Sequence, residues 1–179
     1  MRKVCISFLI VAIIFLSGIA VILPQSQTHA EYLRIHIRAN SNADIDQSVK
    51  YAVKGAVVEY LTPYIAECRT KSQAEEMLKG VLIQVEKVAD RVLQSAGFTY
   101  SSNAEIRREE FPTRVYGELQ LEKGFYDALI IELGDGAGDN WWCVVYPPLC
   151  FTGEGQNYVY RSKIKEIIDE FYQKKGEKQ

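Results

Sequence analysis

The chain has 179 residues, of which 47% are hydrophobic and 25% are charged. This is long and apolar enough for one globular domain, and it excludes a chain that is disordered throughout. The formal net charge is −2 at pH 7. The sequence therefore lacks the excess of Lys and Arg with which proteins neutralise phosphates, and we expect no nucleic-acid partner.

The N-terminal segment has the pattern of an export signal. Residues 4–23 carry no charge and follow a basic pair, and residues 28–30 are a small-x-small cleavage motif. Residues 4–23 are also long enough to span a bilayer, so an uncleaved anchor is the alternative. We expect residues 1–30 to be a secretory signal peptide and residues 31–179 to form a single domain whose membrane contact is limited to this segment.

The exported part begins with a strand at residues 32–39, because apolar and polar residues alternate there. Turn and N-cap residues follow, and apolar residues at three- and four-residue steps then predict a helix over 44–61 that breaks near Pro63. A second helix is expected from a cap at Thr70 or Ser72 to Gly97.

The second half of the chain is rich in strand patterns. We expect strands at 103–111, 114–121, 126–133 and 141–146, a hairpin around the glycine-rich loop 134–140, a helix over 160–172 after a connector at 152–156, and a frayed tail over 174–179. The order β-α-α-β-β-β-β-α predicts an α+β domain in which helices cover one side of a mainly antiparallel sheet.

Three of the four cysteines lie in the exported part. Cys143 and Cys150 flank two prolines that can turn the chain back, so they are candidates for a disulfide in an oxidising compartment. Two buried thiols are the alternative for this pair. Cys68 ends a helical pattern and is expected to be a buried thiol.

The residues with catalytic potential do not form an enzyme signature. His36 is the sole imidazole of residues 31–179, and on a strand it shares a face with Arg34 and Arg38, which predicts a solvated or partner-facing surface. One histidine and scattered cysteines do not make a zinc site, and the glycine-rich loop opens a strand where a phosphate-binding loop would open a helix. Adjacent Glu109 and Glu110 should point to opposite faces. We expect no enzyme activity, metal or cofactor.

One run of residues is highly distinctive. Residues 139–151, DNWWCVVYPPLCF, together with FPTR and YG within 111–117, the loop 134–140, and IHIRANS at 35–41, occur in a fixed order behind the export signal. In these blocks the chain resembles the stage II sporulation protein R family of endospore-forming bacteria. The resemblance spans about residues 32–151.

The resemblance implies a signalling function. Proteins of this family are made in the forespore and secreted into the intermembrane space between forespore and mother cell. There they activate a membrane-embedded aspartic protease of the mother-cell membrane, which processes pro-sigma factor E. The alternatives are an extracytoplasmic cell-wall hydrolase, which would need a carboxylate pair or a metal in a cleft, and a structural envelope protein.

A receptor-contact surface should contain rigid aromatic and arginine side chains, which dominate interface hot spots. On a strand Trp141 and Trp142 face opposite ways, so we expect one to reach a partner while the other packs in the core. Asn140 lies at the loop tip beside this pair, although turn chemistry also explains it, and Asn40 equally suits a helix cap. The candidates for receptor contact are Trp141, Trp142, Arg114, Tyr116, Asn140, His36 and Arg38.

Overall fold

The computed structural model describes residues 29–152 and 158–177. The segment that carries the export-signal pattern and most of the expected connector lie outside these ranges. Within the described ranges, every helix is too short or too polar to cross a membrane.

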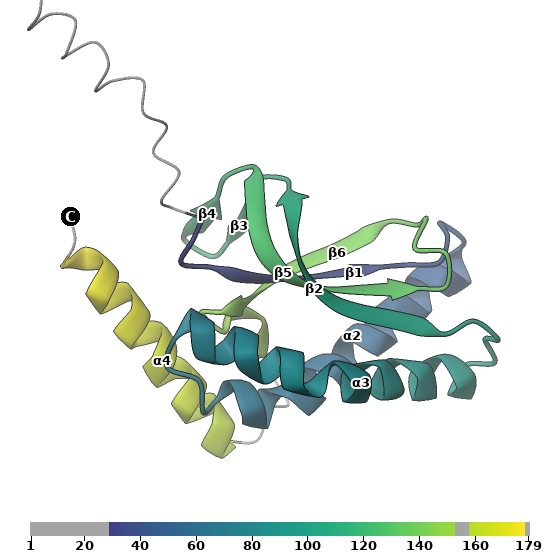
Figure 1. The fold of residues 1–179 in the computed structure, drawn as a ribbon, viewed down its shortest axis with the longest axis horizontal. Helices are drawn as coiled ribbons and strands as arrows, with labels where there is room; N and C mark the ends of the chain where they lie inside the picture. The colour runs from purple at the N-terminus through teal and green to yellow at the C-terminus, as the bar shows by residue number, and fades with distance from the viewer. Residues whose placement is uncertain (1–28, 153–157, 178–179) are drawn as a thin grey trace, which may run out of the picture.

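The centre of the fold is a four-stranded sheet (Figure 1). Its strands are β2 (Ser102–Phe111), β5 (Gly124–Leu133), β1 (Leu33–Arg38) and β6 (Asn140–Tyr146), adjacent to one another in that order. β1 runs parallel to β5, and the other two neighbouring pairs are antiparallel. The expected mainly antiparallel α+β architecture is confirmed.

Two helices cover one face of this sheet (Figure 1). They are α2 (Asp44–Ile65) and α3 (Lys71–Ser95), and their apolar stripes form the main core with the alternate β1 residues Leu33, Ile35 and Ile37. The Thr70 hydroxyl caps α3 by accepting from the backbone N–H of Gln73, and Gly97 follows the helix at φ +84°. The expected bounds of α3 are confirmed.

The expected break of α2 near Pro63 is wrong, because the helix continues to Ile65. Proline in the last turn removes a single backbone donor, and tertiary packing can hold a turn that carries this loss. Leu61 and Ile65 are fully buried on either side of Pro63, and the Thr62 hydroxyl donates to the carbonyl of Val58. Burial of this turn therefore outweighs the proline signal.

The expected hairpin of β5 and β6 is also wrong, because β1 lies between these two strands. The glycine-rich loop crosses the end of β1, where Gly138 N–H donates to the carbonyl of Ala39 and Ala137 N–H donates to that of Asn40. A β-carbon on Gly138 would lie 2.2 Å from the Ser41 carbonyl oxygen. The loop glycines thus permit a close crossing of the backbone.

The expected strand over 114–121 is divided in two. β3 (Arg114–Tyr116) and β4 (Leu119–Leu121) pair with each other as a separate two-stranded sheet, joined through Gly117 at φ +62°. A short 3-10 helix, η1 (Leu149–Phe151), follows β6. The final helix α4 (Tyr158–Gly176) extends into the segment expected to fray.

The second face of the sheet, opposite α2 and α3, carries a smaller core. The β3–β4 hairpin lies over part of it and buries Leu119 and Leu121. Its buried members are Tyr32, Phe111, Leu119, Leu121, Tyr126, Ala128, Ile130 and Val144. Arg34, His36 and Arg38 project from β1 toward this side, so the second face joins an aromatic part with a polar part.

Candidate partner-binding face

Four of the residues proposed as receptor contacts come together on the second face. His36 of β1 is paired in register with Trp142 of β6, and Arg38 with Asn140. Because alternate residues of a strand share a face, these four side chains lie on one side of the sheet. We call them, with the charged side chains that bind Arg38, the polar end of the second face.

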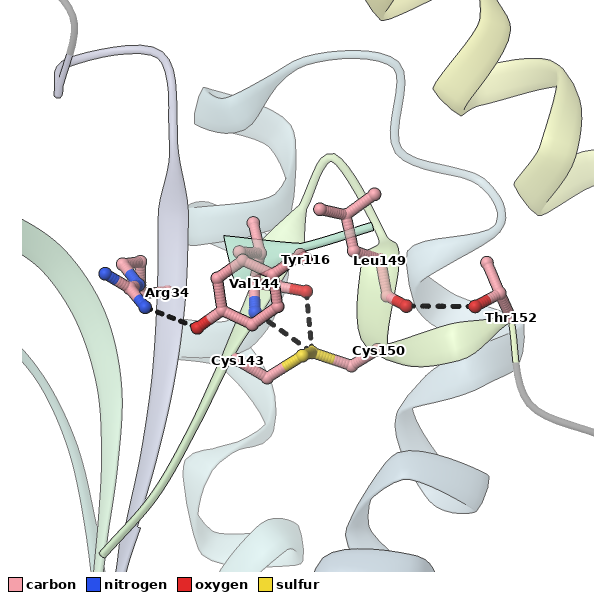
Figure 2. Close-up of a disulfide and its surroundings, with 7 residues drawn as sticks. All are labelled: Arg34, Tyr116, Cys143, Val144, Leu149, Cys150 and Thr152. Atoms are coloured by element: carbon pink, nitrogen blue, oxygen red, sulfur yellow. Dashed lines mark hydrogen bonds between the residues drawn. A yellow bond between two sulfur atoms is a disulfide. The ribbon is translucent and has the colours of Figure 1, made fainter. Parts of the chain in front are cut away.

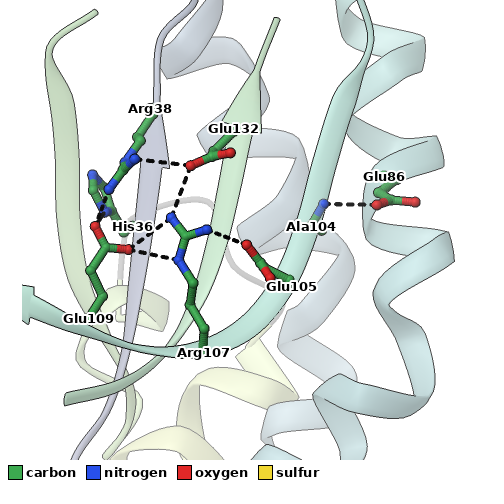
Figure 3. A network of polar contacts seen from close by, with 8 residues as sticks. All are labelled: His36, Arg38, Glu86, Ala104, Glu105, Arg107, Glu109 and Glu132. Carbon is green, nitrogen blue, oxygen red and sulfur yellow. Dashed lines mark hydrogen bonds and ion pairs between the residues drawn. The ribbon is translucent and has the colours of Figure 1, made fainter. Parts of the chain in front are cut away.

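The polar end is held by a network of ion pairs (Figure 3). Arg38 donates to Glu109 and, at 3.0 Å, to Glu132, while Arg107 binds the same two carboxylates and Glu105. β2 curves across the sheet, which brings Glu109 to Arg38 although β5 lies between the two strands. The three carboxylates outnumber the two arginines, so the network is formally anionic when His36 is neutral.

His36 lies beneath this network and is fully buried. Its ring stacks on Trp142 with 3.6 Å between ring centroids, and Phe111 approaches it edge-on at 5.8 Å. Nδ1 is 3.4 Å from Glu109 Oε1, and neither ring nitrogen makes a hydrogen bond to a described residue. Burial lowers the pKa of His36, while Asn140 and Glu109 act in the opposite direction. The ring is therefore a neutral support for Trp142.

Arg34 and His36 are fully buried, so the solvated alternative of the expected surface is wrong for these two side chains. The alternation along β1 does identify a second face. It does not indicate that Phe111, Trp142 and the β3–β4 hairpin contact and cover these two side chains. Of the three polar residues on β1, Arg38 alone keeps partial exposure.

The two tryptophans point to opposite faces, as expected. Trp141 is in register with Ile37 on the helix side, where it packs against the main core and lies 5.7 Å from the Lys54 ammonium. Trp142 packs on the second face, with Phe111 edge-on at 4.7 Å. Both indoles are half-buried, so each has a part accessible to a partner.

Asn140 is exposed at the start of β6, whereas Asn40 is a structural anchor. The Asn40 amide accepts from Asp135 N–H and donates to Asp46, which also accepts from Ser41 and Tyr100. Burial disfavours the Asp46 carboxylate, but these hydrogen bonds prevail and lower its pKa. The alternative that Asn40 caps the first helix is wrong, because the N-cap of α2 is Ala43.

Arg114 and Tyr116 belong to β3 and lie away from the polar end. Arg114 is exposed and donates to the neighbouring Thr113 carbonyl at 3.5 Å, with no carboxylate partner among the described residues. Tyr116 is half-buried, and its hydroxyl accepts from Arg34 (Figure 2). The second face thus contains two separate groups of proposed contact residues.

The cysteines are arranged as expected (Figure 2). Cys143 and Cys150 form a disulfide with 6.1 Å between their α-carbons, which closes the turn through Pro147 and Pro148. Cys68 is a buried free thiol whose pKa is raised by burial. The bridge ties the middle of β6 to η1.

Sequence reasoning missed Glu132, Arg107 and the position of Glu109 above His36. The period-two alternation of Glu105, Arg107 and Glu109 was the available signal, because it places three charged residues on one face of β2. Glu109 and Glu110 do point apart, since Glu110 pairs with Lys123. No group of three or more metal-ligating His, Cys, Asp or Glu side chains occurs in the described ranges.

Comparison with known proteins agrees with the resemblance carried by these residues. Residues 29–156 match the family described as Stage II sporulation protein R (spore_II_R). Stage II sporulation protein R of Bacillus subtilis (strain 168) is 34% identical over 119 residues, which are 66% of this chain and 53% of that relative. The chain thus spans about half the length of this relative, and no solved structure matches it significantly. The chain belongs to the Stage II sporulation protein R family.

Proposed function

We propose that this protein is a secreted signal between the two compartments of a sporulating cell. It is made in the forespore, exported through residues 1–30 into the intermembrane space, and activates a membrane-embedded aspartic protease in the mother-cell membrane. That protease then processes pro-sigma factor E. Family membership supports the sporulation role, and the charge-free segment 4–23 behind a basic pair supports export.

The proposed contact site is inferred from the rigid setting of Trp142. His36 stacks on one side of its ring and Phe111 meets it edge-on, while two carboxylates hold Arg38 nearby. Side chains that are already fixed lose little conformational entropy when a partner binds. A half-exposed tryptophan beside a fixed arginine therefore suits a protein interface.

The proposal assigns binding, and no catalytic step, to the polar end. An activating ligand must bind the active arrangement of its receptor better than the inactive one. Each carboxylate of the network binds an arginine, so these side chains hold one another in place. A network whose charged groups are already engaged with one another, beside a half-exposed tryptophan, favours recognition over a catalytic step.

The test is cleavage of pro-sigma factor E in a non-sporulating host that makes the receptor protease. The three arms are the exported chain, the chain without residues 1–30, and no chain. We expect cleavage with the exported chain alone. Cleavage that is independent of the chain would contradict the proposed function.

Variants in the same assay locate the contact. Trp142→Ala should reduce activation about tenfold or more, the effect of losing an interface hot spot. Tyr51→Ala is the matched control, because this aromatic side chain is 54% exposed on α2, on the opposite side of the sheet. Equal activation by both folded variants would keep the function and reject the polar end as its contact site.

A further inference from the structure

Arg34 is a buried cation on the aromatic part of the second face. Its side chain is fully buried, and its guanidinium carbon lies 4.2 Å from the ring centroid of Phe111, 4.9 Å from that of Tyr126 and 5.5 Å from that of Tyr116. Cation–π contacts of this kind attract the guanidinium but satisfy none of its N–H groups as an acceptor does.

The hydrogen bonds of Arg34 are incomplete. Nη2 donates to the Tyr116 hydroxyl, whereas Nε and Nη1 are buried and have no hydrogen-bond partner in the described ranges. No carboxylate forms an ion pair with Arg34 among the described residues, and Arg114 adds a repulsive positive charge. Burial lowers the pKa of Arg34. The site therefore lacks an acceptor for these donors. A buried charge with unused N–H donors destabilises the folded state.

The cover over Arg34 is the β3–β4 hairpin. Among the described residues, this hairpin pairs only within itself and forms no backbone ladder with the main sheet. Tyr116, Leu119 and Leu121 hold it down through side-chain contacts. Figure 2 shows the Tyr116 hydroxyl directed at Arg34. If the hairpin lifts, Arg34 loses this acceptor and gains access to the outside.

We propose that Arg34 is a concealed binding site for a carboxylate group, closed by Tyr116 and opened by displacement of the β3–β4 hairpin. A planar carboxylate matches the guanidinium fork, to which it can bind through two parallel hydrogen bonds. The flat aromatic walls and the single buried positive charge favour a planar monoanion over a dianionic phosphate. The site is distinct from the polar end and does not depend on the identity of the receptor.

The test uses the protein purified after export, with thermal unfolding measured against increasing sodium acetate. Ligand that binds the folded state raises Tm in a saturable way, and sodium chloride at equal ionic strength is the control. Wild type should show a saturable rise in acetate alone. Tyr116→Phe should bind acetate about three- to tenfold more tightly, because Nη2 is then free and the cover loses its hydrogen bond. Arg34→Met should show no acetate-specific rise.

A second arm distinguishes the source of the carboxylate. N-acetylglutamate α-amide presents a protein-like side-chain carboxylate, and tighter binding than acetate would indicate a protein partner. Equal binding would indicate a free small carboxylate, and both results support the site. A saturable rise that persists in Arg34→Met, or its absence in both wild type and Tyr116→Phe, would overturn the inference. Neither result depends on whether the chain activates a protease.

Discussion

Arg34 and Arg38 lie four positions apart on one strand and project toward the same face, yet their surroundings are opposite. Arg38 is partly exposed and binds Glu109 and Glu132. Arg34 is fully buried among aromatic rings, with a phenol hydroxyl as its sole hydrogen-bond acceptor in the described ranges. Arg38 is thus part of a completed network of ion pairs, whereas Arg34 has N–H donors without an acceptor in the described ranges. The difference indicates that a fixed contact surface and a concealed binding site adjoin on one face.

Phe111 joins the two regions, since its ring contacts Arg34, His36 and Trp142. Phe111→Ala should therefore disturb both and lower the free energy of unfolding by about 3–5 kcal/mol, the usual cost of removing a buried phenylalanine. Urea denaturation of the exported protein measures this. Phe125→Ala is the control, because Phe125 is 54% exposed, and its cost should stay within about 0.5 kcal/mol. Similar losses in both variants would contradict the central position of Phe111.

The disulfide supports the Arg34 region, because Val144 is in register with Arg34 and follows Cys143 directly. Replacing Cys143 and Cys150 by Ser should lower the free energy of unfolding by about 2–4 kcal/mol, with the lower value favoured by the small ring. Urea denaturation with and without reductant provides the measurement. A count of three free thiols in the unreduced wild-type protein would reject the bridge.

Exchange of each arginine for methionine sharpens the comparison directly. Arg38→Met removes a donor from Glu109 and Glu132 and should lower the free energy of unfolding by about 1–2 kcal/mol. This is less than the loss expected for a fully buried ion pair, because Arg38 is partly exposed. Arg34→Met removes a buried charge that has no counter-ion and should leave stability unchanged or increased. Urea denaturation of both variants under the same conditions measures the two changes in stability. A larger loss of stability for Arg34→Met than for Arg38→Met would contradict the view that Arg38 is the better satisfied of the two arginines.

The smallest expected effect is a pH dependence from His36. Its pKa in the folded state is lowered, so the unfolded chain, with a value of about 6.5, binds the proton more readily. Stability should then be greatest above about pH 6.5 and decline as the pH falls through that value. His36→Gln should flatten this decline between about pH 7.5 and 5.5, measured as the urea midpoint. A decline of the same size in His36→Gln would exclude His36 as the cause.

Much of the fold follows from periodicity in the sequence. The three- and four-residue steps of α3, with its Thr70 cap and Gly97 terminus, gave correct bounds because these signals are local. The pairing of β1 between β5 and β6 did not follow, since strand order depends on contacts between distant segments. The glycine-rich loop suggested a hairpin, and its glycines in fact serve a backbone crossing at Ser41.

The candidate site was also predictable only in part, because alternation along a strand is a local signal and contacts between distant segments are not. Alternation placed Arg34, His36 and Arg38 on one face of β1, but it could not reveal that β2 curves over that face and supplies Glu109 and Phe111. The sequence favours Tyr116 as an aromatic interface residue, whereas its contact with Arg34 depends on the position of the β3–β4 hairpin. Charge patterns identify which residues share a face, and tertiary structure decides which of them are covered.

The bridge between Cys143 and Cys150 also bears on solubility. β6 is an edge strand of the main sheet, and unpaired edges can recruit strands of other chains. The bridge folds η1 back along β6, where the outward N–H of Val144 donates to Cys150 Sγ at 3.0 Å. Oxidation therefore shields part of this edge from association with other copies, and reduction would reopen it as a template for aggregation.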